Sequence, residues 1–230
     1  MIRENIKILK EKVNNACLRA GRNPEEIEIV GVTKTVGIEK IKEAVEAGIT
    51  HVGENRVQEY LEKYDFFKAN NLKADIIGHL QTNKVKYIAE SVNLIQSVDS
   101  VKLANEISKH AKKINRVIPV LLEINAAGEE SKSGVSFSEI FELAHRISEI
   151  PFLSVKGIMS IPPVFTDEVT ARGYFEKLYK IYVDISNKNI DNIYMDILSM
   201  GMSKDYEYAV LEGSNMIRVG TGIFGARQYL

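Results

Sequence analysis

The stretch Ile27-Glu-Ile-Val-Gly-Val-Thr-Lys-Thr35 decides the fold expected for this chain. Its residues are mostly apolar and β-branched, which predicts a strand buried on both faces of a parallel sheet. Lys34 stands at the carboxyl end of this strand. At the rim of a sheet, the cost of desolvating an ammonium lowers the pKa of the amine and favours its neutral, nucleophilic form. A lone lysine that merely ends a strand would instead point into water. Whether Lys34 is functional therefore depends on what the rest of the chain places near it.

Short apolar runs alternate along the chain with segments whose apolar residues recur at helical spacing. The expected strands cover residues 27–33, 50–53, 74–78, 93–97, 117–124, 152–158, 194–198 and 215–219. The expected helices cover about 3–20, 38–47, 56–68, 82–90, 101–111, 140–147, 166–185 and 204–212. Strands that alternate with helices in this way indicate a parallel sheet.

One leading helix followed by eight strands with helices between them predicts an α/β protein with a closed (β/α)8 TIM barrel, in a single domain over residues 1–230. An open doubly wound sheet is the alternative, because the strands over 50–53 and 93–97 are short. In a barrel the active site lies at the carboxyl ends of the strands, so Lys34 would face the functional rim.

Charge and cysteine content narrow the class of protein. The 30 basic and 31 acidic residues leave a net charge of −1, whereas nucleic-acid and membrane-surface partners require a basic excess. Cys17 is the only cysteine, which excludes an internal disulfide and favours a reducing compartment. Charges interrupt the apolar stretches near the amino terminus, so we expect no signal peptide, and no run is long enough to span a bilayer. We expect a cytoplasmic monomer.

Two loops near the carboxyl terminus are suited to bind an anion. Leu198-Ser-Met-Gly-Met-Ser-Lys-Asp205 joins the strand at 194–198 to a helix, and Ser203 is placed to cap that helix. Arg218-Val-Gly-Thr-Gly-Ile-Phe-Gly225 follows the last strand, where its glycines can form a nest of backbone N–H groups. Simple capping by Ser203 would need no ligand, but loops after the seventh and eighth strands are the recurrent phosphate site of barrels.

Other patterns are excluded or left open. The Gly-x-Gly-x-x-Gly match over 220–225 is not a dinucleotide fingerprint, because only five residues remain after it. Arg218 needs a ligand or an acidic partner if it points into the barrel, and pairs with a helix if it points outward. His51 and His79 follow strands, but no His, Cys or carboxylate set has metal-ligand spacing, so we expect no metal. The chain also lacks a Gly-x-Ser-x-Gly nucleophile elbow.

A Schiff-base lysine beside a phosphate site is what pyridoxal 5′-phosphate (PLP) requires. At this point the chain resembles the pyridoxal phosphate homeostasis proteins, also called the proline synthetase co-transcribed family, over nearly its whole length. The motifs that carry the resemblance are Val32-Thr-Lys-Thr35, Val52-Gly-Glu-Asn55 with 57–59, 77–84, 128–132, 198–203 and 217–225. Several motifs in the right order are specific, although no single one would be.

The resemblance implies a PLP-binding barrel of fold type III, similar to the amino-terminal domain of alanine racemase. Lys34 would form the Schiff base, and Asn55 would line the ring pocket. Arg218 would face the pyridine nitrogen and keep it unprotonated, which would make the ring a weaker electron sink. The phosphate would be held by Ser199, Ser203, Gly220 and Thr221, with a backbone contact from Met200.

The chain departs from the family pattern at two places. Ala74 and Asp75 stand where a Trp-His pair is frequent, which affects any role of that histidine but not the cofactor site. Arg56 follows Asn55 where an aromatic residue is frequent. It would either tune the charge of the pocket or face solvent.

Racemases of this fold use a tyrosine from a second, β-rich domain as the opposite base, whereas the predicted barrel uses the whole chain. The resemblance therefore implies a protein that binds, buffers and delivers PLP, with PLP-dependent apo-enzymes as transient partners. Two alternatives stay open. One is a weak amino-acid racemase that uses Lys34 with a tyrosine or histidine at the rim. The other is a Schiff-base, aldolase-like barrel without PLP.

Overall fold

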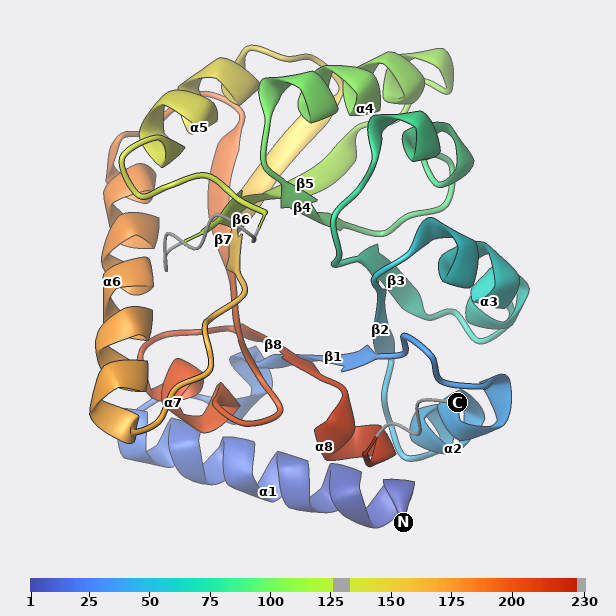
Figure 1. The fold of residues 1–230 in the computed structure, drawn as a ribbon, viewed down its shortest axis with the longest axis vertical. Helices are drawn as coiled ribbons and strands as arrows, with labels where there is room; N and C mark the ends of the chain where they lie inside the picture. The colour runs from blue at the N-terminus through green and yellow to red at the C-terminus, as the bar shows by residue number, and fades with distance from the viewer. Residues whose placement is uncertain (126–132, 227–230) are drawn as a thin grey trace.

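The computed structural model describes residues 1–125 and 133–226 of the chain, and within them eight parallel strands close into a barrel (Figure 1). Neighbours in the barrel are neighbours in sequence, and β8 closes against β1. The strands are β1 (Glu28–Val32), β2 (His51–Glu54), β3 (Lys73–Ile76), β4 (Ile95–Val98), β5 (Ile118–Ile124), β6 (Leu153–Ser160), β7 (Ile193–Met202) and β8 (Met216–Val219). The predicted barrel is confirmed, and the doubly wound alternative is wrong because β8 pairs with β1 and leaves no open edge.

Helices surround the barrel and follow the strands in alternation (Figure 1). They are α1 (Ile2–Ala20), α2 (Ile38–Glu46), α3 (Val57–Ala69), α4 (Val101–Lys113), α5 (Ile140–Ser148), α6 (Glu168–Asn187), α7 (Tyr206–Leu211) and α8 (Thr221–Phe224), with 3-10 turns η1 (Pro24–Glu26) and η2 (Thr82–Tyr87). The helix expected at 82–90 is this shorter 3-10 turn. Its one buried residue, Val85, lies three positions before the buried Ile88 at the C-cap, which matches the period of a 3-10 helix.

Helix α1 holds the carboxyl-terminal elements in place. Its buried stripe includes Ile6, Leu9 and Val13. At its start, Asn5 donates from Nδ2 to the carbonyl of Ile223 in α8 at 2.9 Å. Beyond its end, Arg22 donates from Nη1 to the carbonyls of Val210 and Ser214, both at 2.8 Å. The first helix of the chain therefore supports the two loops that follow β7 and β8.

Strand β7 is longer than expected and changes the position of the loop after it. It runs to Met202, so Ser199 and Met200 lie in the strand and not in the turn. Pairing with β8 continues past the predicted end, because Ser199 is opposite Met216 and Met202 is opposite Arg218, with an irregularity between them. Gly201 permits this irregularity: its φ is +94°, and a Cβ there would lie 2.6 Å from the Cβ of Ala209.

The caps of two helices also differ from expectation. Asp205, not Ser203, is the N-cap residue of α7, and its Oδ1 accepts a hydrogen bond from the Met202 N–H at 2.6 Å. Asp167, not Thr166, caps α6, where its Oδ1 accepts from the Thr170 N–H at 2.8 Å. Only Asp167 accepts from an N–H of the first turn of its helix, whereas the Asp205 carboxylate bonds back to the loop before α7. A negative charge at either position is favoured by the positive end of the helix dipole.

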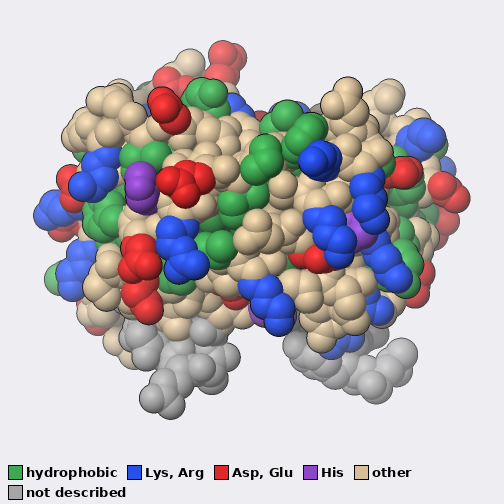
Figure 2. Space-filling view, turned by 90° about the horizontal axis from the view of Figure 1, so that it is seen from above, with side chains coloured by type: hydrophobic (Ala, Val, Ile, Leu, Met, Phe, Trp, Pro, Cys, Tyr) green, Lys and Arg blue, Asp and Glu red, His purple; other side chains and the backbone are tan. Residues whose placement is uncertain are grey.

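The surface mixes both signs of charge. Figure 2 shows acidic and basic side chains interspersed on one face with small apolar patches between them. No described helix combines the length and apolarity needed to cross a membrane. The 128–132 motif lies outside the described residues.

Candidate functional site

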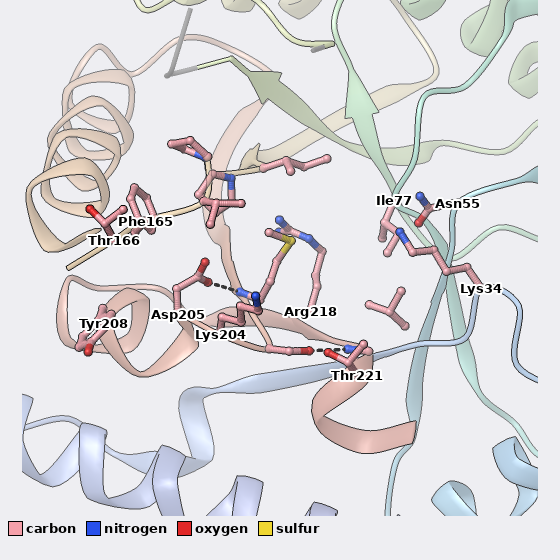
Figure 3. Close-up of a pocket in the computed structure, with 18 of the residues that line it drawn as sticks. Lys34, Asn55, Ile77, Phe165, Thr166, Lys204, Asp205, Tyr208, Arg218 and Thr221 are labelled. Atoms are coloured by element: carbon pink, nitrogen blue, oxygen red, sulfur yellow. Dashed lines mark hydrogen bonds between the residues drawn. The ribbon is translucent and has the colours of Figure 1, made fainter. Parts of the chain in front are cut away.

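A cavity of about 550 Å³ opens at the carboxyl ends of the strands (Figure 3). The ends of β1, β2, β7 and β8 contribute to its wall, and the segment 161–168 after β6 forms the opposite side. Six of the predicted site residues line it: Lys34, Asn55, Ser203, Arg218, Gly220 and Thr221. They come from segments nearly two hundred residues apart in sequence, and the closed barrel brings them together.

Lys34 lies two residues after the end of β1 and enters the cavity beside Asn55 and Ile77 (Figure 3). The next residue, Thr35, has a φ of 60°, a left-handed conformation that β-branched residues rarely adopt. The Glu59 carboxylate accepts a hydrogen bond from the Thr35 N–H at 2.6 Å and so holds this turn. Lys34 therefore lies between strand β1 and a turn that is held by the hydrogen bond to Glu59.

Lys63, Glu54 and Thr33 form a hydrogen-bonded cluster next to Lys34. Lys63 on α3 donates from Nζ to the carbonyl of Thr33 at 2.8 Å and to Glu54 Oε1 at 2.7 Å. The Thr33 hydroxyl donates to the same Glu54 oxygen at 2.6 Å. Burial raises the pKa of the Glu54 carboxyl, while the bonds from Lys63 and Thr33 lower it. Sequence analysis did not single out Lys63, because a helical lysine gives no local sign that it is buried.

Arg218 on β8 points into the barrel. Its Nη1 donates to Ser199 Oγ at 2.6 Å, and its Nη2 donates to the carbonyl of Ser160 at 2.7 Å. Burial lowers the pKa of the guanidinium to about 10, so it remains charged at neutral pH. Within the described residues no carboxylate forms an ion pair with it, although Glu123 and Asp205 are near enough to favour its charge.

Ser199 and Met200 do not line the cavity. Both are fully buried in β7. The Ser199 hydroxyl accepts from Arg218 and donates to Gln96 Oε1 at 2.7 Å, and the Met200 carbonyl accepts from Ser214 Oγ at 2.8 Å. The longer β7 explains this difference from the expected phosphate contacts, because both residues belong to the strand and are buried in it.

The loops after β7 and β8 meet at one hydroxyl group. Ser203 Oγ accepts hydrogen bonds from the N–H groups of Gly220 at 3.2 Å and Gly222 at 3.1 Å. A Cβ at position 222 would lie 2.8 Å from a methyl group of Val219, so glycine keeps this turn compact. The first N–H groups after β8 thus converge beside Ser203 and Thr221, where an anion can accept from them.

Sequence analysis missed the wall that faces Lys34. It consists of the segment 161–168 with Tyr208, and it is rich in apolar and proline residues. Glu123 in β5 was also missed: burial, with the nearby Asp99 charge, raises the pKa of its carboxyl to about 7, and Arg218 opposes this. None of these residues belongs to a short motif, although Pro162-Pro163 after a predicted strand signals a turn.

Comparison with known proteins identifies the family. The family model described as alanine racemase, N-terminal domain, matches residues 2–228. A pyridoxal phosphate homeostasis protein from Aquifex aeolicus is 42% identical over 226 residues, covering 98% of both chains. The chain belongs to the pyridoxal phosphate homeostasis protein family. The resemblance that the motifs indicated is confirmed.

Solved structures add to this relationship. PipY from Synechococcus elongatus, in a structure with PLP bound, superposes with a TM-score of 0.85 at 27% identity and covers 98% of this chain and 100% of its own. An alanine racemase from Clostridium difficile has a TM-score of 0.70 at 18% identity, and the match covers 99% of this chain and 57% of the racemase. The racemase shares the fold alone.

The two departures from the family pattern have structural consequences. Arg56 is exposed and does not line the cavity, so it faces solvent. Asp75 is fully buried and accepts hydrogen bonds from Asn93 at 2.8 Å and Gln96 at 2.7 Å, while His51 lies 2.8 Å away. Among the described residues no group of three or more His, Cys, Asp or Glu is arranged to hold a metal.

Proposed function

We propose that this chain binds PLP through Lys34 and serves to buffer and deliver it inside the cell. The observation that carries the proposal is that Lys34 and the paired loops after β7 and β8 line one cavity. PLP supplies an aldehyde that a lysine amine captures reversibly as a Schiff base, and its phosphate needs a separate anion site. Membership of the homeostasis family supports this role.

The residues present fit PLP. Ser203, Gly220 and Thr221 would receive the phosphate, because backbone N–H groups already point there at an oxygen atom. Asn55 and Arg218 would border the ring between that site and Lys34. Ser199 and Met200 would act without touching PLP. Ser199 accepts a hydrogen bond from Arg218, and the Met200 carbonyl accepts one from Ser214. A cavity of about 550 Å³ is in the usual range for small-molecule sites.

Arg218 favours a carrier over a catalyst. A group that remains charged at neutral pH, placed beside the pyridine nitrogen, would keep that nitrogen unprotonated. The ring would then withdraw electrons weakly, which limits carbanion chemistry. We propose accordingly that the chain acts as one PLP-binding domain over residues 1–230, as a cytoplasmic monomer with PLP-dependent apo-enzymes as transient partners.

A weak amino-acid racemase is the second candidate. Tyr208 and Lys34 line the same cavity from different walls, and a tyrosine is able to act as a base opposite the lysine (Figure 3). Exchange of the α-proton of an amino acid with deuterated water would detect this activity. Exchange that Tyr208→Phe abolishes would favour the racemase, and no exchange in the PLP-loaded protein would exclude it.

The visible absorption spectrum of the purified, PLP-treated protein tests the main proposal. The wild type should show the band of lysine-bound PLP, and Lys34→Ala should lack it. Lys204→Ala is the matched control, because Lys204 lines the same cavity from the loop after β7. The band should persist in that control. Absence of the band from the wild type after incubation with PLP would leave the aldolase-like barrel without PLP as the better proposal.

A further inference from the structure

A chain of buried polar side chains runs from Arg218 into the barrel. Arg218 donates to Ser199 Oγ at 2.6 Å, and Ser199 donates to Gln96 Oε1 at 2.7 Å. Gln96 in turn donates from Nε2 to Asp75 Oδ2 at 2.7 Å. Ser199, Gln96 and Asp75 have no exposed surface, and Arg218 is 4% exposed. The cavity residue is therefore connected to side chains of β3 and β4, on the other side of the barrel.

The chain continues to the amino-terminal end of the barrel. His51 lies between two carboxylates, with Nε2 2.8 Å from Asp75 Oδ2 and Nδ1 3.0 Å from Glu28 Oε1. Lys73 pairs with the same Glu28 oxygen at 3.1 Å. Glu28, His51 and Lys73 line a second cavity of about 400 Å³. His51 therefore connects Asp75, inside the barrel, to Glu28 at the second cavity.

Asp75 determines the direction of every bond in the chain. A carboxylate only accepts hydrogen bonds, so it orients the Gln96 amide with its N–H groups toward Asp75 and its oxygen toward Ser199. The Ser199 hydroxyl has one hydrogen, which it directs to that oxygen. A lone pair of Ser199 is then left for Arg218. With the opposite orientation of the amide, Gln96 and Arg218 would both present donors to Ser199.

An apolar interior would be the simpler way to fill this barrel, because burying polar groups is costly unless every one is satisfied. Arg218 cannot lose its charge and needs acceptors for its donors. The carbonyl of Ser160 and the hydroxyl of Ser199 are two of these acceptors. The orientation of Ser199 in turn depends on Gln96 and Asp75, which do not touch the cavity.

We propose that Asp75 and Gln96 are positioning residues for Arg218, which hold its guanidinium at the cavity from the interior of the barrel. The part of this inference that concerns PLP rests on the proposed function. The part that concerns Arg218 in the cofactor-free protein does not. It also assigns a role to Asp75, which stands where the family pattern often has a histidine.

Two measurements on Asp75→Asn and Gln96→Met test the proposal. In the cofactor-free protein, nitrogen-edited NMR should show slowly exchanging side-chain N–H signals of Arg218 in the wild type and fast exchange in both variants. Titration with PLP should show an affinity about tenfold lower in both variants, the usual effect of weakening a charged hydrogen bond. Ser108→Ala is the control, because Ser108 is a largely buried hydroxyl that bonds the Pro151 carbonyl at 2.6 Å, outside the chain.

The outcomes separate this proposal from the proposed function. A wild type that protects Arg218 but does not bind PLP would contradict the function and leave the positioning role intact. Rapid exchange of Arg218 in the wild type would overturn the positioning role, and that measurement needs no variant. So would variants that keep both the protection and the PLP affinity, or an equal loss of affinity in Ser108→Ala.

Discussion

At the scale of single residues, Lys63 bonds to the backbone carbonyl of Thr33, the residue before Lys34. Lys63 carries the positive charge that Glu54 needs in a buried setting, since Glu54 is 1% exposed and Lys63 8% exposed. Lys63→Met would leave that carboxyl without its partner, and breaking a buried pair in this way costs about 3 kcal/mol of unfolding free energy. Urea denaturation would measure the loss.

Lys68→Met is the matched control for Lys63→Met, because Lys68 lies on the same helix and is exposed. It should leave the unfolding free energy nearly unchanged. Adding Glu54→Gln to Lys63→Met should recover part of the loss, because the orphaned charge is then removed. Equal effects of the two lysine substitutions would contradict this account of the cluster.

The residues that sequence analysis placed at the rim were those that carry their own signal. Lys34 ends an apolar strand, and Gly220 belongs to a glycine pattern after the last one. Lys63 looks like any surface lysine of a helix, because its burial follows from how α3 packs on the barrel and not from its neighbours in sequence. Ser199 was expected to contact the phosphate because it belongs to the motif over 198–203. The direction of its side chain depends on where β7 ends, and the motif does not show that end.

At the scale of elements, Ser203 joins the loops after β7 and β8. Ser203→Ala removes the acceptor of the Gly220 and Gly222 N–H groups. We expect faster hydrogen exchange of the Gly222 amide and an affinity for PLP about tenfold lower, because a phosphate-binding donor and the alignment of two others are lost. Ser203→Thr keeps the hydroxyl and should retain most of the affinity. An unchanged exchange rate in Ser203→Ala would show that the two loops are held together by other contacts.

Element boundaries were the weakest part of the sequence-based predictions. Strand β7 extends beyond its apolar run because β8 continues to pair with it, and a pairing partner is not visible in a single segment. The short helix α8 was not expected, since its residues Thr221–Phe224 include a glycine and read as a loop. Type and order were correct for the strands and for most helices, because they follow from periodicity and alternation.

At the scale of the whole molecule, the sequence predicted that the barrel closes but not that hydrogen-bonded polar side chains fill part of its interior. Alternation of strands and helices leads to a parallel barrel, but Asp75, Gln96 and Ser199 meet only because β3, β4 and β7 turn them to the same interior. Each of the three looks like an ordinary polar residue at the edge of an apolar run. The hydrogen bonds that join the three residues span 21 and 103 residues of sequence, so register in three dimensions decides the contacts.

The network also makes the stability of the barrel depend on pH through His51. Burial alone would lower the pKa of the imidazole, but the hydrogen bonds and charges of Asp75 and Glu28 together raise it to about 9. A folded-state pKa above the unfolded value of about 6.5 means that the charged histidine stabilises the fold fully below that lower pH. The contribution, up to about 3 kcal/mol, should then disappear as pH rises through 9.

Urea denaturation of the wild type and His51→Gln at several pH values between 6 and 10 would measure this contribution. The difference in unfolding free energy should be largest near pH 6 and should shrink toward zero by pH 10, because the other titrating groups contribute equally to both proteins. His145→Gln, a substitution at an exposed histidine, is the control and should change the unfolding free energy little. A difference for His51→Gln that grows with pH would mean that the neutral imidazole is the stabilising form, and the interior would then hold Asp75 without a balancing charge.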